Sequence, residues 1–133
     1  LQQLKCLRIS RIRQSKALIA LVPNLVKLKR LQIHSDDLKN SDVRVIAQSN
    51  SIVNLDLSGN SEITGEAVKF LPSRLTKLIM RDCKIEPKHI DNFAHLTNLK
   101  ELKLTYKNWS QTDLEKLQVT LPKCAINAPD GSS

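Results

Sequence analysis

The stretch IVNLDLSGNSEITGEAV, residues 52–68, decides the fold, because it reads as one complete structural repeat. Ile52, Leu55 and Leu57 have the spacing of a short strand. Asn60 lies where the chain turns, and its side-chain amide is expected to bond backbone groups of neighbouring turns. An amphipathic run with helical spacing follows the turn. The stretch therefore predicts a strand, a turn and a short helix packed against the strand.

The same pattern recurs along the chain in steps of 23 or 24 residues. Three strand columns are apolar in every copy: Leu4, Leu28, Ile52, Leu75 and Leu99; Leu7, Leu31, Leu55, Leu78 and Leu102; and Ile9, Ile33, Leu57, Met80 and Leu104. Two later columns are apolar as well: Ile19, Val43, Ala67, Ile90 and Leu114; and Val22, Ile46, Phe70, Phe93 and Leu117. Residues three apart share a helix face, so each copy is predicted to be a strand followed by a helix.

Elements this short cannot bury an apolar face alone, so the copies are expected to stack around one continuous core. LKRLQIHSDDL (28–38), LTKLIMRDCKI (75–85) and LKELKLTYKNW (99–109) resemble the leucine-rich repeat pattern L-x-x-L-x-L-x-x-N/C-x-L. IVNLDLSGNSEI (52–63) is similar to the helical, cysteine-containing subtype, of bacterial or intracellular-receptor type. The resemblance implies an α/β leucine-rich repeat solenoid, with short parallel β-strands on the concave side and short α-helices on the convex side.

The repeat starts, near residues 4, 28, 52, 75 and 99, assign residues 1–126 to one leucine-rich repeat domain. A truncated closing strand is expected at 121–126, and a flexible tail at 127–133. The first strand column follows Leu1 so closely that the edge of the core is expected to be open there. We therefore interpret the chain as a C-terminal fragment of a longer protein, in which another domain covers this end.

Positive charge is concentrated in the first half of the chain. The formal net charge is +8, and residues 1–50 hold ten basic and three acidic side chains, against eleven and ten in residues 51–133. Strand residues between the leucines are expected to point outward onto the concave sheet. With an exposed aromatic as an anchor, the candidate contact residues are Arg8, Arg11, Lys29, Arg30, His34, Lys77, Arg81, Lys103 and Tyr106.

This charge pattern favours a protein–protein interaction module that binds a partner, one with an acidic surface, through the concave face. One alternative is a ligand-sensing or regulatory arm of a larger intracellular receptor or effector. The pattern is also consistent with polyanion binding through the basic N-terminal repeats, and with a structural cap for a neighbouring domain. The basic face is equally interpretable as solvated surface. Nucleic acid is disfavoured, because no aromatic side chains interleave with the basic ones.

No catalytic constellation or cofactor motif is present in the sequence, so we expect neither enzymatic activity nor a cofactor. His34 stands near Asp36 and Asp37, but no second cluster completes a metal coordination shell, and no metal is expected. The chain has no apolar run long enough to span a membrane. It has three cysteines and no C-x-x-C pair, which favours a reducing, intracellular and cytoplasmic location.

Overall fold

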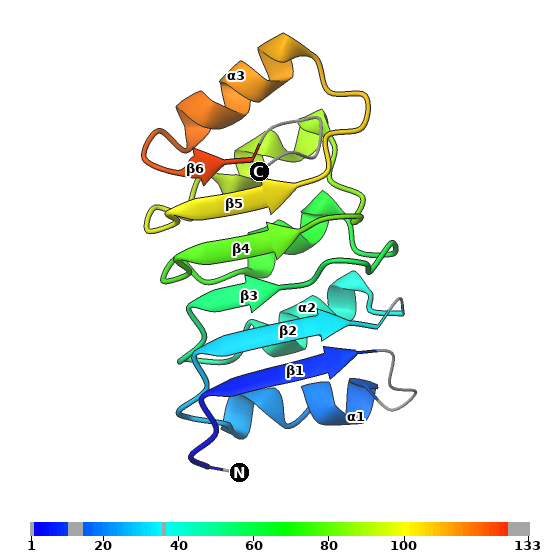
Figure 1. Ribbon diagram of the computed structural model, residues 1–133, viewed down its shortest axis with the longest axis vertical. Coiled ribbons are helices and arrows are strands. Elements are labelled where there is room, and N and C mark those ends of the chain that lie inside the picture. The colour runs from blue at the N-terminus through cyan, green and yellow to red at the C-terminus, as the bar shows by residue number, and fades with distance from the viewer. Residues whose placement is uncertain (1, 11–14, 36, 128–133) are drawn as a thin grey trace.

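A computed structural model describes residues 2–10, 15–35 and 37–127, which form a six-stranded parallel sheet backed by short helices (Figure 1). The strands are β1 (Cys6–Ser10), β2 (Arg30–His34), β3 (Asn54–Asp56), β4 (Lys77–Met80), β5 (Glu101–Leu104) and β6 (Ala125–Ile126). The α-helices are α1 (Ser15–Ile19), α2 (Asn40–Ile46) and α3 (Gln111–Thr120), and the 3₁₀ helices are η1 (Val22–Asn24), η2 (Gly65–Phe70) and η3 (Pro87–Phe93). The strands lie in chain order, so the predicted α/β solenoid of parallel strands is confirmed.

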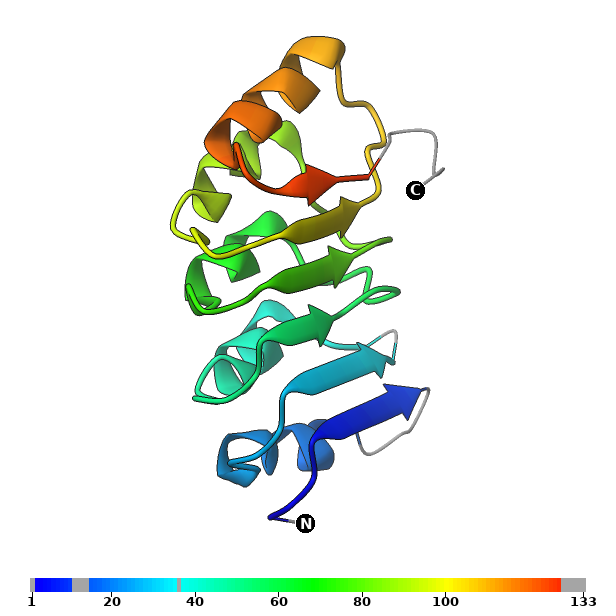
Figure 2. The same ribbon diagram turned by 60° about the vertical axis from the view of Figure 1, so that its left-hand side comes forward.

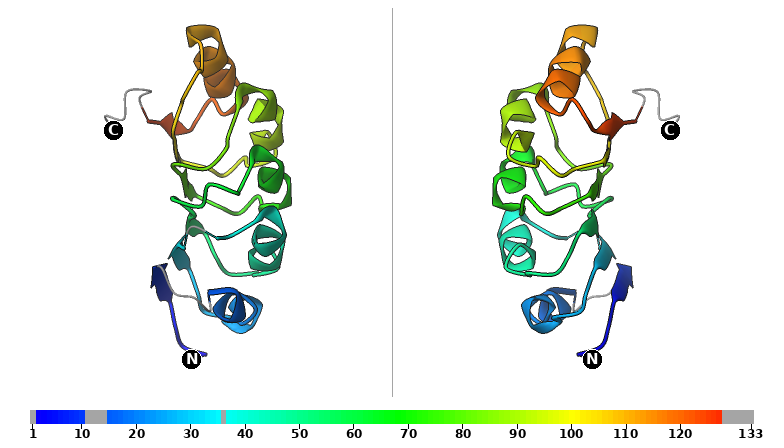
Figure 3. Two further views of the ribbon diagram at one scale, coloured as in Figure 1. Left: turned by 90° about the vertical axis from the view of Figure 1, so that its right-hand side faces the viewer. Right: turned by 90° about the vertical axis from the view of Figure 1, so that its left-hand side faces the viewer.

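The sheet and the helices form two separate layers. Seen from the side, the sheet occupies the inner face of a shallow arc and the helices lie on its outer face (Figure 3). Figure 2 shows the same strands stacked from β1 at the N-terminal end to β6 at the C-terminal end. Among the described residues, one face of the sheet is therefore left uncovered along the whole stack.

The strands pair in the register that the leucine columns predict. Leu31 lies opposite Leu55, Leu55 opposite Leu78, and Leu78 opposite Leu102. None of these four leucines, here called the leucine ladder, is more than 1% exposed. Burying a leucine side chain stabilises the fold by about 1.5–3 kcal/mol. Because every ladder leucine packs between two repeats, this stabilisation belongs to the stack and not to a single repeat.

In two repeats, η2 and η3, the convex element is a 3₁₀ helix, where the prediction was a short α-helix. A 3₁₀ helix rises about 2.0 Å per residue, against 1.5 Å in an α-helix, so it spans the same distance with fewer residues. It also places residues three apart on one face, and Ile90 and Phe93 in η3 are both buried. In η3 the 3₁₀ helix thus keeps the predicted residues on the core side. In η2 it buries Ala67 and Val68, and Phe70, which the helix column placed on the core face, is only partly buried.

The turn amide of Asn60 joins two repeats, as predicted. Its Nδ2 group donates to the carbonyl oxygens of Ile33, at 2.9 Å, and Leu57, at 2.8 Å. Its Oδ1 atom accepts from the Leu38 N–H at 3.4 Å. Asn60 is fully buried, so removing its amide would take these hydrogen bonds from the Leu38 N–H and the Ile33 carbonyl. The Leu57 carbonyl would keep the Cys83 thiol as a donor at 3.3 Å.

The two ends of the stack differ. At the N-terminal end Leu4 and Leu7 are only half-buried, whereas their counterparts Leu28 and Leu31 are fully buried. At the other end the side-chain amide of Asn127 bonds the end of β5 as the backbone of a neighbouring strand would. Its Oδ1 atom accepts from the Leu104 N–H, and its Nδ2 group donates to the Leu104 carbonyl, both at 2.8 Å. Asn127 was expected in the flexible tail and is anchored. The rest of that tail lies outside the described residues.

A buried histidine also links two repeats. His89 in η3 is 4% exposed, and its Nδ1 atom accepts from the Glu86 N–H at 3.0 Å. Gly65, at the start of η2, packs against the ring so closely that a Cβ atom there would lie 2.1 Å from His89 Cγ. Burial lowers the pKa of the His89 imidazole below its ordinary value. The folded state therefore favours the neutral ring.

We expect Leu78→Asp to unfold the whole stack cooperatively, with a loss of about 3–5 kcal/mol in the free energy of unfolding. The reason is that a carboxylate at this fully buried position has no ionic partner. Lys103→Glu, on an outward position of β5, is the control and should cost about 1 kcal/mol or less. Chemical denaturation followed by circular dichroism measures both, and a Leu78→Asp variant with wild-type stability would contradict the register.

The lowered pKa of His89 predicts a pH-dependent stability. The unfolded chain binds the imidazole proton at a higher pH than the folded chain, so the free energy of unfolding should fall as pH drops below about 6.5. His89→Gln keeps an acceptor for the Glu86 N–H and should flatten this dependence between about pH 7 and pH 5. Lys16→Gln, at an exposed position on α1, is the control and should leave this dependence unchanged. Equal slopes in both variants, from thermal unfolding at several pH values, would refute the assignment.

Candidate binding surface

The uncovered side of the sheet, here called the concave face, consists of the strand side chains that alternate with the leucines. Their in-register columns run across the strands as Arg30, Asn54, Lys77 and Glu101, and as Arg8, Gln32, Asp56, Ile79 and Lys103. A third column, at or just past the strand ends, contains Ser10, His34, Ser58, Arg81 and Thr105. Each column places its members about 4.8 Å apart from strand to strand, so their spacing is fixed by the backbone.

Seven of the nine predicted contact residues lie on this face or at its edge. Six belong to the columns: Arg8, Arg30, His34, Lys77, Arg81 and Lys103. Lys29 directly precedes β2 and is exposed, like its neighbour Arg30. Arg11 lies outside the described residues. The strand alternation thus brings the cationic candidates together, and their role in binding stays a prediction.

The expectation that Tyr106 is an exposed anchor is wrong. Tyr106 is 6% exposed, its hydroxyl donates to Asn127 Oδ1 at 2.9 Å, and its ring meets Trp109 edge-on at 5.3 Å. The alternation of β5 continues past the strand end, so Thr105 points outward and Tyr106 points inward. Burial also raises the pKa of the Tyr106 phenol. Tyr106 stabilises the last turn and offers no free aromatic surface to a partner.

At the β4–β5 side of the concave face, charges are paired. Glu101 lies 3.5 Å from the Nζ atoms of both Lys77 and Lys103. All three side chains are partly exposed, and ion pairs of this kind contribute about 1 kcal/mol or less to stability. One carboxylate is shared by two ammonium groups, so the cluster keeps a net positive charge.

Asp56, in the middle of the face, is also engaged. Its Oδ1 atom lies 3.2 Å from His34 Nε2 and accepts from the Ser58 N–H at 3.0 Å. His34 Nε2 also lies 3.3 Å from the amide of Gln32, and one ring nitrogen cannot donate to Asp56 and accept from Gln32 at once. Asp56 is therefore held by its own neighbours and is not the counter-ion of an arginine.

Arg8 and Arg30 are the unpaired cations of the face. Both are exposed, and neither forms an ion pair with any residue of the described ranges. Arg81 contributes a further cation, whose Nη2 atom is buried and has no hydrogen-bond partner among the same residues. The columns of the concave face together carry five arginines and lysines against two carboxylates. The face is therefore net positive, and beside β1 and β2 its column arginines have no ion-pair partner among the described residues.

A hollow of about 180 Å³ opens in this positive part of the face. Its lining consists of three cations, one carboxylate, two amides and two apolar residues: Arg8, Arg30, Lys77, Asp56, Gln32, Asn54, Leu31 and Ile79. We call it the cationic hollow. Pockets for small organic ligands usually measure about 300–1,000 Å³, so this one is sized for a single side chain. Gln32, Asn54 and Ile79 were not candidates from the sequence, although their alternation with buried leucines is a signal that finds them.

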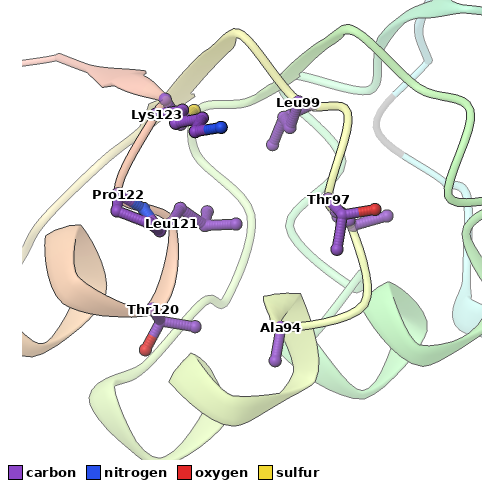
Figure 4. Close-up of a pocket in the computed structure, with 9 residues that line it drawn as sticks. Ala94, Thr97, Leu99, Thr120, Leu121, Pro122 and Lys123 are labelled. Carbon is purple, nitrogen blue, oxygen red and sulfur yellow. The ribbon is translucent and has the colours of Figure 1, made fainter.

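Another hollow, of about 220 Å³, lies on the far side of the solenoid, between the end of η3 and the end of α3 (Figure 4). Leu99, Leu121 and Pro122 supply its apolar wall, and Lys123 is the one charged residue of its lining. None of the predicted contact residues lines it. Nothing in the described residues indicates an occupant, so we do not propose this hollow as a binding site.

Comparison with known proteins identifies the architecture. Neither a protein-family model nor a curated protein sequence matches the chain. Among solved structures, the crystal structure of the TLR13–ssRNA13 complex matches with a TM-score of 0.68 and 19% identity, over 95% of this chain and 19% of that chain. TLR13 is a leucine-rich repeat protein. The present chain folds as a leucine-rich repeat solenoid.

The similarity to the TLR13 structure is limited in sequence identity and in the length of chain that it covers. At 19% identity it shows the fold alone, and the chain spans about a fifth of the length of the TLR13 chain that it matches. Leucine-rich repeat solenoids are commonly protein-binding modules and typically carry no enzymatic activity. The helical, cysteine-containing subtype stays a prediction. No helix in the described part of the chain is long and apolar enough to cross a membrane.

The three cysteines of the solenoid lie in different environments. Cys6 in β1 is exposed, whereas burial raises the pKa of the Cys83 thiol to about 12 and that of Cys124 to about 11. All three are free thiols. Within residues 2–10, 15–35 and 37–127 no group of three or more His, Cys, Asp and Glu side chains is placed to hold a metal ion.

This difference predicts selective thiol labelling. The thiolate is the reactive form, so at pH 8 the thiols of Cys83, which is partly buried, and Cys124, which is buried, should react with iodoacetamide far more slowly than Cys6. Mass spectrometry after limited labelling of the folded protein measures the three sites separately. In denaturant all three should react at similar rates. Fast labelling of Cys83 in the folded protein would show that the turn after β4 is open.

Proposed function

We propose that this solenoid is a protein–protein interaction module that binds an acidic partner surface through its concave face. The observation that carries the proposal is that the exposed cations Arg8 and Arg30 form no ion pair within the described residues, on a face that is net positive and built on regular strands. The paired sheet already fixes the backbone positions of these residues, so binding has to order their side chains but not the backbone. A positive surface also accelerates the encounter with an acidic partner.

The composition of the face favours a protein over a uniform polyanion. Asp56 and Glu101 place two carboxylates among the cations, and Ile79 adds an apolar side chain. A polyanion would be repelled by these carboxylates along part of the surface, whereas a protein can match a mixed pattern. Nucleic acid is disfavoured further, because Tyr106 points into the turn and offers no ring for base stacking. The RNA in the TLR13 complex is a ligand of that protein.

The same proposal includes a neighbouring domain of the parent protein and a cellular location. The half-buried Leu4 and Leu7 leave the N-terminal end of the core partly open, which supports a neighbouring domain packed against β1. Three free thiols support an intracellular, cytoplasmic location. In that setting the solenoid is the binding arm of a larger receptor or effector, and it needs no enzymatic activity of its own.

Two matched charge-reversal variants test the proposal. The concave variant replaces Arg8, Lys29 and Arg30 with glutamate, and the convex variant replaces the exposed Lys16, Lys88 and Lys123. Both change the net charge equally, so a difference between them reports position and not total charge. We expect the concave variant alone to lose, by about tenfold or more, a protein that the wild type retains from lysate at about 0.15 M salt. Quantitative mass spectrometry of the bound fraction measures the loss.

Two outcomes would contradict this function. Equal retention by both variants would show that the concave cations do not select a partner. Bound material that is nucleic acid or a sulfated polysaccharide, and that dissociates steeply as salt rises, would instead support polyanion binding.

A further inference from the structure

The shape of the cationic hollow follows from a short side chain between two long ones. Arg30, Asn54 and Lys77 lie in register on β2, β3 and β4. Neighbouring strands are about 4.8 Å apart, so the Cα atoms of Arg30 and Lys77 are separated by roughly 10 Å, with the short amide of Asn54 between them. Arg8 on β1 adds a third long cation. The backbone register thus arranges three cations around the short amide of Asn54.

These cations lack sufficient counter-charge within the described residues. Arg8 and Arg30 form no ion pair there, and Lys77 shares Glu101 with another lysine. Asp56 also lines the hollow, but His34 and the Ser58 N–H already hold it. A guanidinium group binds a carboxylate through two parallel hydrogen bonds, which makes arginine well suited to such a ligand. The hollow therefore fits an added anion.

Size and charge select the kind of anion. A volume of about 180 Å³ accepts a side chain and is too small for most cofactors. The proposed partner is a protein, and the anionic side chains of a protein are the carboxylates of aspartate and glutamate. The amides of Gln32 and Asn54 offer further N–H donors. These features favour the carboxylate of an aspartate or glutamate.

Ile79 offers an apolar contact to the part of the partner that lies next to that carboxylate. It is half-buried on the outward side of β4, between Lys77 and Arg81 on its own strand, and Asp56 and Lys103 flank it in the neighbouring strands. An apolar spot ringed by charged side chains is the arrangement found around the energetically important centre of many protein interfaces. The same hollow therefore offers one contact for an anion and one for an apolar group.

We propose that the cationic hollow is a subsite for one acidic side chain of the protein partner, with an adjoining apolar side chain of that partner packed on Ile79. This rests on the proposed function and narrows it, because it names the partner's recognition element as a carboxylate beside an apolar residue. Arg8 and Arg30 bind the carboxylate, and Lys77 completes its charge neutralisation.

Side-chain NMR with defined peptides tests the subsite. The probes are a hexapeptide of alternating glutamate and isoleucine, the same peptide with glutamine for glutamate, and inorganic phosphate. Both peptides have blocked ends, so a terminal carboxylate cannot act. We expect the glutamate peptide to shift the Nε–Hε signals of Arg8 and Arg30 and the methyl signals of Ile79. The glutamine peptide should bind at least about tenfold more weakly. Equal binding of both peptides, no shift at these three side chains, or equal shifts with phosphate would overturn the proposal.

Point variants of the full chain place the binding in the hollow. Arg30→Gln and Ile79→Ser should each weaken the glutamate peptide by about tenfold, while Lys16→Gln on the convex side leaves it unchanged. Amide spectra show whether each variant keeps the fold. If neither hollow variant weakens the peptide, the subsite is refuted. The proposed function would still stand if the concave charge-reversal variant loses its partner from lysate, so the two failures are distinguishable.

Discussion

The structure depends on the packing of the leucine ladder, because no single repeat can bury its own apolar residues. A strand of three to five residues has only one face to bury, and the helix behind it is too short to be stable alone. Leu55 and Leu78 are excluded from water only because the strands on both sides continue the same columns. Stability is therefore shared along the stack, and a defect in one repeat is felt by its neighbours. Asn60 reinforces this coupling, since its buried amide bonds the turns of two repeats at once.

The same constraint creates the binding surface. Once the leucines fix the register, the residues between them must point outward in straight columns. Arg30, Asn54 and Lys77 therefore form a hollow without any specialised loop. The charge of the face is then set by which residues are already paired. Glu101 and Asp56 have partners within the sheet, and the positive charge that remains is concentrated beside β1 and β2.

Much of this arrangement follows from the sequence, and the exceptions have physical reasons. The repeat period predicts the strands, their register and their buried columns, because all three depend on backbone geometry. The type of helix does not follow, since apolar residues three apart suit an α-helix and a 3₁₀ helix alike, as Ile90 and Phe93 show. Tyr106 was misplaced because the strand alternation was not carried past the end of β5. The contact of Gly65 with His89 and the ion pair of His34 with Asp56 each join residues of different repeats, and no local pattern encodes them.

The central claim is that a protein partner covers the concave face, and lysine footprinting tests it most directly. The complex captured from lysate would be treated briefly with an acetylating reagent and compared with the free solenoid by mass spectrometry. Lys29, Lys77 and Lys103 should lose reactivity in the complex, while the exposed Lys16 and Lys88 on the helical side keep theirs. Protection of Lys16 and Lys88, with the other three lysines unchanged, would contradict the account and move the interface to the convex side.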